Sequence, residues 1–72
     1  MKKSYKIEVE CANCAGKMET ALNKLAEVKE ARVNFLLQKL TIEFAEGCDP
    51  KAVMHEAQRV CRRIEPDCTI EL

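Results

Sequence analysis

Two cysteines, Cys11 and Cys14, are separated by two residues near the start of the chain. Thiols at this spacing can both reach one atom, and the chemistries that such a pair serves are binding of a soft metal ion and formation of a disulfide bond. The pair lies where an alternating strand pattern passes into an amphipathic helix pattern, so we expect Cys14 in the first helical turn. Unpaired N–H groups and the helix dipole there would favour its thiolate. Spacing and position together predict a metal-binding or thiol-exchange site.

The composition describes one ordinary globular domain with a modest core: 72 residues, 47% hydrophobic and 33% charged. Lys+Arg and Asp+Glu balance at 12 each, and Tyr5, Phe35 and Phe44 are the only aromatic residues, which argues against nucleic-acid binding. No apolar run approaches the roughly 20 residues of a membrane span, so we expect no direct membrane insertion. Five cysteines without a signal-peptide pattern indicate a reducing compartment, hence the cytoplasm or a cytoplasm-facing domain.

Hydrophobic periodicity predicts six elements in the order βαββαβ. Alternation indicates strands at residues 4–10, 31–35, 40–44 and 68–72, and helical spacing indicates helices at residues 14–25 and 50–64. Asp49 is the expected N-cap of the second helix and Pro66 its stop. An antiparallel four-stranded sheet with both helices on one face would bury these stripes. We therefore expect a single α+β domain over residues 1–72, a ferredoxin-like βαββαβ sandwich, present as a monomer.

The connections of such a fold alternate between the two ends of the sheet. The CxxC loop, the hairpin tip at residues 36–38 and the loop at residues 65–67 share one end, and Cys48 falls at the other. Leu36 and Leu37 at the tip either form an apolar docking surface beside the site or simply close the hairpin.

The segment CANCAGKME (residues 11–19), followed by Leu22 and Leu25 on this layout, resembles the heavy-metal-associated domain. Such domains occur in metallochaperones and at the N-termini of metal-pumping P-type ATPases, and the likeness covers nearly the whole chain. It implies Cys11 and Cys14 as ligands of a soft metal ion, a partner metal-transport protein or the rest of an ATPase, and no catalysis by the domain itself. The chain departs from the family in Glu8-Val9-Glu10, where Gly-Met-x is usual, with Val9 in the core position of that Met.

A second departure concerns the metal. Copper-type members usually carry Thr, Ser or His before the first cysteine, and Lys, Tyr or Phe in the last loop; here those places hold Glu10 and Glu65-Pro66. This looks more like the domains of zinc-, cadmium- and lead-exporting ATPases, which implies Zn²⁺, Cd²⁺ or Pb²⁺ as the ion, with Cu⁺ still open. Glu10 is the candidate third ligand, since a divalent ion wants more than two thiolates and carboxylate oxygen suits zinc. A merely solvated glutamate would occupy the same outward face.

The remaining polar and sulfur-bearing candidates have plainer interpretations. Cys61 and Cys68 fall on inward faces of the second helix and last strand, where free cysteine is a common core residue, although either could be a softer third ligand. Cys48 is expected to be exposed and adventitious, and His55 to be solvated. Lys17, one turn after Cys14, either stabilises the thiolates by its charge or is an ordinary surface lysine.

A thiol–disulfide oxidoreductase is the alternative function, because a βαβ pattern with a CxxC pair is also typical of thioredoxin. Against it, the chain is short, its hairpin order differs, and it lacks the expected aromatic residue and proline around the motif.

Overall fold

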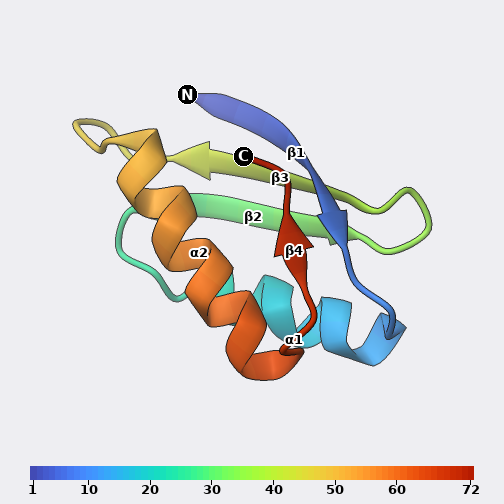
Figure 1. Cartoon of the computed structure of the whole chain (residues 1–72). Helices are drawn as coiled ribbons and strands as arrows, with labels where there is room; N and C mark the ends of the chain where they lie inside the picture. Colours follow the sequence, from blue (N-terminus) through green and yellow to red (C-terminus); the bar gives the residue numbers. More distant parts are fainter.

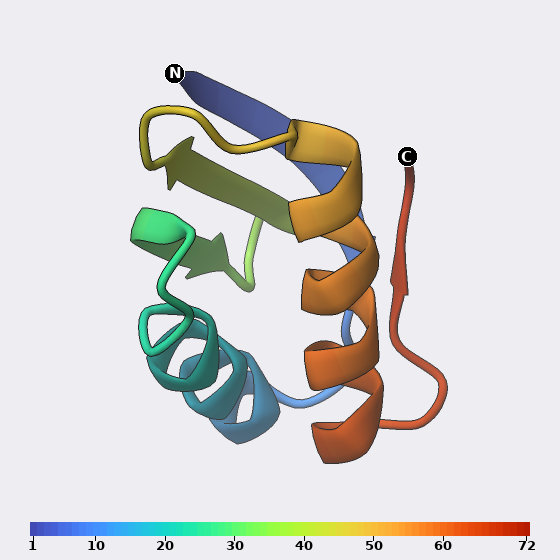
Figure 2. The same cartoon turned by 90° about the vertical axis from the view of Figure 1, so that its left-hand side faces the viewer.

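The computed structural model describes residues 1–72, and its elements follow the predicted order. They are β1 (Lys2–Glu8), α1 (Ala12–Leu22), β2 (Val28–Asn34), β3 (Lys39–Phe44), α2 (Pro50–Ile64) and β4 (Thr69–Ile70). The four strands form one antiparallel sheet in the spatial order β2-β3-β1-β4, and both helices lie on the same face of it (Figures 1 and 2). The ferredoxin-like sandwich predicted from the sequence is confirmed.

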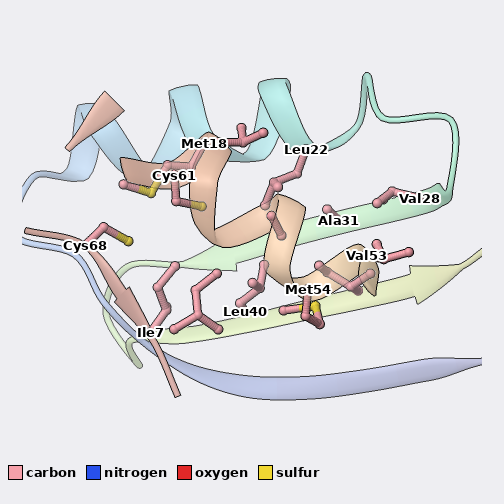
Figure 3. Close-up of a cluster of buried hydrophobic side chains, with 14 of the residues drawn as sticks. Ile7, Met18, Leu22, Val28, Ala31, Leu40, Val53, Met54, Cys61 and Cys68 are labelled. Atoms are coloured by element: carbon pink, nitrogen blue, oxygen red, sulfur yellow. The ribbon is translucent and has the colours of Figure 1, made fainter. Parts of the chain in front are cut away.

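The core lies between the sheet and the two helices (Figure 3). All 17 buried residues are hydrophobic or cysteine, and no polar or charged residue is buried. The predicted inward stripes supply it: alternate residues of the strands, such as Ile7 and Leu40, meet the apolar faces of α1 and α2. Removal of this apolar surface from water is the main force that holds the helices against the sheet.

Apart from α2, the predicted elements have different bounds in the structure; β2 spans Val28–Asn34 instead of 31–35, and β3 begins at Lys39 instead of 40. Strand β1 begins at Lys2 and ends at Glu8, although Val9 is still buried as expected. Helix α1 ends at Leu22, so Leu25 lies in the turn that follows it rather than in the helix. Strand β4 has only two residues, and Leu72, expected on its inward face, is 60% exposed. The prediction for Leu72 was wrong because β4 pairs with β1 only through Ile70 and Thr69.

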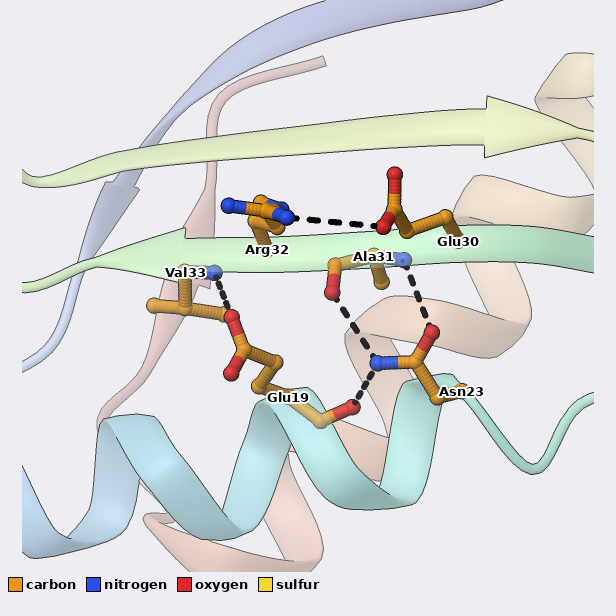
Figure 4. A network of polar contacts seen from close by, with 6 residues as sticks. All are labelled: Glu19, Asn23, Glu30, Ala31, Arg32 and Val33. Carbon is orange, nitrogen blue, oxygen red and sulfur yellow. Dashed lines mark hydrogen bonds and ion pairs between the residues drawn. The ribbon is translucent and has the colours of Figure 1, made fainter.

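Side chains of α1 cover the free edge of strand β2 (Figure 4). The Asn23 amide donates to the Ala31 carbonyl at 3.0 Å and its oxygen accepts from the Ala31 N–H at 2.9 Å, while a Glu19 carboxylate oxygen accepts from the Val33 N–H at 3.0 Å. Asn23 is also the residue at which α1 stops, and its side chain donates to the Glu19 carbonyl at 2.8 Å. These contacts fix the end of α1 against the sheet and pair edge groups that would otherwise be open to another strand.

Helix α2 begins and ends as predicted. The Asp49 carboxylate accepts from the Lys51 N–H at 3.1 Å as the N-cap, and Pro50 occupies the first turn, where its missing N–H costs no hydrogen bond. The helix ends at Ile64, two residues before Pro66. None of the helices is long and apolar enough to cross a membrane.

Candidate metal centre

Cys11 and Cys14 lie at the N-terminus of α1. Cys11 is the N-cap residue, with extended backbone (φ −124°, ψ 122°), and its sulfur accepts a hydrogen bond from the Cys14 N–H at 3.4 Å. Cys14 is in the first turn, as predicted. The non-helical backbone at Cys11 turns its side chain back toward the turn that carries Cys14. The two sulfurs therefore share one side of the helix start.

The two thiols differ in acidity. Hydrogen bonds from the backbone N–H of Cys14, and then from the Cys14 thiol, lower the pKa of Cys11. Donating that thiol hydrogen bond to Cys11, together with burial, raises the pKa of Cys14. The prediction that the helix start favours the thiolate form of Cys14 over its thiol was wrong, because the N-cap sulfur of Cys11, rather than the sulfur inside the turn, accepts the free N–H group.

The surroundings of the pair are half open. Cys11 is exposed and Cys14 is partly buried against the core, so the site has a packed inner side and an open outer side. The positive charge of Lys17 lowers the pKa of Cys14, although by less than the causes that raise it. Of the two interpretations left open for Lys17, its charge thus acts on Cys14 in the direction of the first.

The three loops expected at this end of the sheet do meet here. At the hairpin tip, the Gln38 side-chain oxygen accepts from the Val9 N–H at 2.8 Å and the Gln38 carbonyl accepts from the Ile7 N–H at 3.1 Å. Gln38 adopts a positive φ of 52° at this tip. The tip thereby holds the segment that leads into Cys11, while Leu36 and Leu37 beside it are 89% and 70% exposed.

The carboxylate of Glu65 reaches the CxxC loop from the far end of the chain. Both of its oxygens accept from the Glu10 N–H, at 3.3 and 3.2 Å. Its negative charge disfavours both thiolates. It partly offsets the lowering of the Cys11 pKa and adds to the raising of the Cys14 pKa. The Glu10 side chain is exposed, on the outward side predicted for it. Glu65 stands out in the sequence because copper-type members usually have another residue in the last loop. Only the structure shows that its carboxylate contacts the backbone of Glu10.

No group of three or more Cys, His, Asp and Glu side chains is arranged to hold a metal ion. The structure brings together two sulfurs, with one carboxylate bound to the adjoining backbone. A third protein ligand is not in place, although the Glu65 carboxylate contacts the backbone of Glu10, the residue directly before Cys11.

The other candidates have the following places in the structure. Cys61 and Cys68 are fully buried core residues, as expected. His55 is exposed, also as expected. Cys48 is in the loop before α2, but it is partly buried against the core rather than exposed. The predicted exposure was wrong because Cys48 packs against the hydrophobic core cluster.

Comparison with known proteins identifies the family of this chain. The model of the heavy-metal-associated domain matches residues 4–60. A cadmium, zinc and cobalt-transporting ATPase from Helicobacter felis is 34% identical over 67 residues, which are 93% of this chain and 9% of that protein. The chain thus spans less than a tenth of that relative.

Two solved structures have the same fold. One is the N-terminal domain of a potential copper-translocating P-type ATPase from Bacillus subtilis in the Cu(I)-loaded state, with a TM-score of 0.73 and 27% identity over 99% of this chain and 84% of that one. The other is the N-terminal domain of a zinc(II) ATPase, with a TM-score of 0.72 and 19% identity over 99% and 63%. The comparisons give the oxidoreductase alternative no support. The family match over most of the sequence, on this fold, shows that the chain belongs to the heavy-metal-associated domain family.

Proposed function

We propose that the domain binds one soft metal ion through the thiolates of Cys11 and Cys14 and passes it to a partner. The observation that carries this proposal is the placement of both thiols at the open start of α1, with Cys11 predisposed to lose its proton. Two ligands leave the coordination shell incomplete, whereas a structural zinc site encloses the ion with four. An incomplete shell lets ligands of a partner enter and take the ion.

The ion that suits the site best is divalent: Zn²⁺, Cd²⁺ or Pb²⁺, with Cu⁺ as the weaker fit. Cu⁺ with two thiolates carries a net charge of −1, and a nearby carboxylate adds repulsion without a needed bond. A divalent ion with two thiolates is neutral, so it can accept a carboxylate oxygen. Glu10 is the ligand proposed from the sequence, and Glu65, whose carboxylate already lies on the Glu10 N–H, is the second source of that oxygen.

The relatives support a role in metal transport. The Helicobacter felis protein transports cadmium, zinc and cobalt, and it is much longer than this chain. We propose that the domain is either the metal-binding part of a metal-transporting P-type ATPase or a small metallochaperone that serves one. In both cases it acts on the cytoplasmic side, as a monomer, and its partner is a metal-transport protein.

Selectivity is tested by removing each carboxylate separately. At about 4 Å a partly screened interaction between unit charges is worth about 1–4 kcal/mol, or roughly tenfold or more in affinity. We expect Glu10→Thr and Glu65→Gln to weaken Zn²⁺ and Cd²⁺ binding by that factor and to leave Cu⁺ binding equal or tighter. Competition titrations with chelators measure all three ions.

The matched control is Glu46→Gln, an exposed glutamate in the loop that carries Cys48, at the opposite end of the sheet. It should leave all three affinities unchanged. If neither Glu10→Thr nor Glu65→Gln differed from this control, the preference for divalent ions would lose its physical basis, while binding by the two thiols would still stand.

A further inference from the structure

Two further cysteines lie together in the core and take no part in the proposed metal site. Cys61 is in the last turn of α2 and Cys68 directly precedes β4, and neither is exposed to solvent. Figure 3 shows the Cys68 thiol directed toward α2, on the side where Cys61 lies. Burial, and the proximity of Cys68, raise the pKa of Cys61 to about 12. The two thiols are thus close enough to affect each other's ionisation.

The backbone between the two cysteines is fixed by hydrogen bonds. The Glu65 N–H donates to the Cys61 carbonyl and the Cys68 N–H donates to the Glu65 carbonyl, each at 2.9 Å. The Arg62 guanidinium donates through Nε to the Cys68 carbonyl, also at 2.9 Å. These contacts fix the backbone of the short segment that joins the two cysteines, so that their relative position does not drift while the domain is folded.

Strand β4, which directly follows Cys68, is held in place by few contacts. It has two residues and pairs only with β1. On its other side it depends on Gln58 of α2, whose side-chain oxygen accepts from the Ile70 N–H at 2.7 Å and whose amide donates to the Ile70 carbonyl at 3.4 Å. Short elements with few contacts open at a lower free energy than the whole fold. Opening of β4 would expose Cys68 while α2 stays folded.

We propose that Cys61 and Cys68 form a redox modification site, which a small-molecule disulfide converts to an intramolecular disulfide that ties β4 to α2. In the open form the Cys68 thiolate attacks one sulfur of the small disulfide, forms a mixed disulfide and releases one small thiolate. The Cys61 thiolate then attacks the Cys68 sulfur and releases the second. The small disulfide is reduced to two thiols, and the protein loses two hydrogen atoms.

The test uses a variant in which only the inner pair remains, Cys11→Ser/Cys14→Ser/Cys48→Ser, treated with glutathione disulfide. Because this variant lacks the proposed metal ligands, its outcome is independent of the proposed function. We expect an intact mass lower by two hydrogen atoms, a Cys61–Cys68 cross-link in the peptide map, unchanged circular dichroism and reversal by a reductant. Stable mixed disulfides, covalent dimers, or thiols that stay unmodified while the urea-unfolded chain reacts would overturn the proposal.

The route is tested by a pair of substitutions on α2 in the same background. Gln58→Ala removes both hydrogen bonds to Ile70, so β4 should open more often and the disulfide should form about fivefold faster. Arg59→Ala is the control, because Arg59 contacts only Glu56 through an exposed ion pair and should leave the rate unchanged. Equal rates in the two variants would contradict entry through β4.

Discussion

At the scale of single residues, the two cysteines of the CxxC pair have different chemical characters. The sequence identified the pair and its place at a helix start, because spacing and the change of hydrophobic period are visible in the residues. It did not identify which sulfur is the more acidic, since that depends on the extended backbone at Cys11 and on the hydrogen bond from the Cys14 N–H. The position of the Glu65 carboxylate, against the Glu10 N–H, likewise depends on a contact between distant segments.

This difference predicts the order in which the thiols react. The thiolate is the nucleophile, and the N–H of Cys14 stabilises it at Cys11, so Cys11 should be alkylated first near neutral pH. Iodoacetamide labelling of the reduced, metal-free protein, followed by peptide mapping over time, measures the rates at the five cysteines. Cys61 and Cys68 should react slowest, because both are buried. Faster labelling of Cys14 than of Cys11 would contradict the assignment.

At the scale of elements, the features that could be predicted are those set by hydrophobic periodicity and by local capping and proline signals. The inward stripe of α2, its Asp49 cap and its end before Pro66 were all correct, because each depends on neighbouring residues. The end of α1 was not predicted, because Asn23 is held by Ala31 in another element. The shortness of β4 also escaped prediction, since alternation through Leu72 says nothing of whether a partner strand continues beside it.

The contact between α1 and the edge of β2 predicts a large effect for one substitution. Asn23→Ala leaves the Ala31 N–H and carbonyl without partners in a partly buried place, so the free energy of unfolding should fall by about 1–3 kcal/mol. Thr20→Ala is the control, because the Thr20 hydroxyl bonds only to the Gly16 carbonyl of its own helix, and its effect should stay within about 0.5 kcal/mol. Urea denaturation measures both. Equal effects would show that the edge of β2 does not depend on Asn23.

At the scale of the whole molecule, a core without buried charge still contains two buried thiols, and these make stability depend on pH. The native pKa of Cys61 is about 12, whereas the ordinary value is 9.0. Between these values the unfolded chain loses a proton that the native chain keeps, so the contribution of Cys61 to stability is constant below about pH 9 and falls as the pH rises from there to about 12. The slope should be up to about 1.4 kcal/mol per pH unit for each thiol.

Replacing this thiol by a hydrocarbon isolates its part of the pH dependence. Denaturation of the reduced protein at a series of alkaline pH values should show a shallower loss of stability for Cys61→Val than for the parent chain. Lysine and tyrosine titrations are common to both proteins and cancel in the comparison. Identical slopes would mean that the Cys61 thiol is not held neutral by the fold.

Metal binding by the thiol pair is the central claim, and a metal titration of the reduced chain tests it most directly. Zn²⁺ or Cd²⁺, measured against a competing chelator, should bind with one ion per chain, and Cys11→Ser/Cys14→Ser should abolish this binding while circular dichroism stays unchanged. Cys48→Ser should bind as the parent does, because Cys48 lies at the other end of the sheet. Undiminished binding by the Cys11→Ser/Cys14→Ser variant, or its loss in Cys48→Ser alone, would contradict the account.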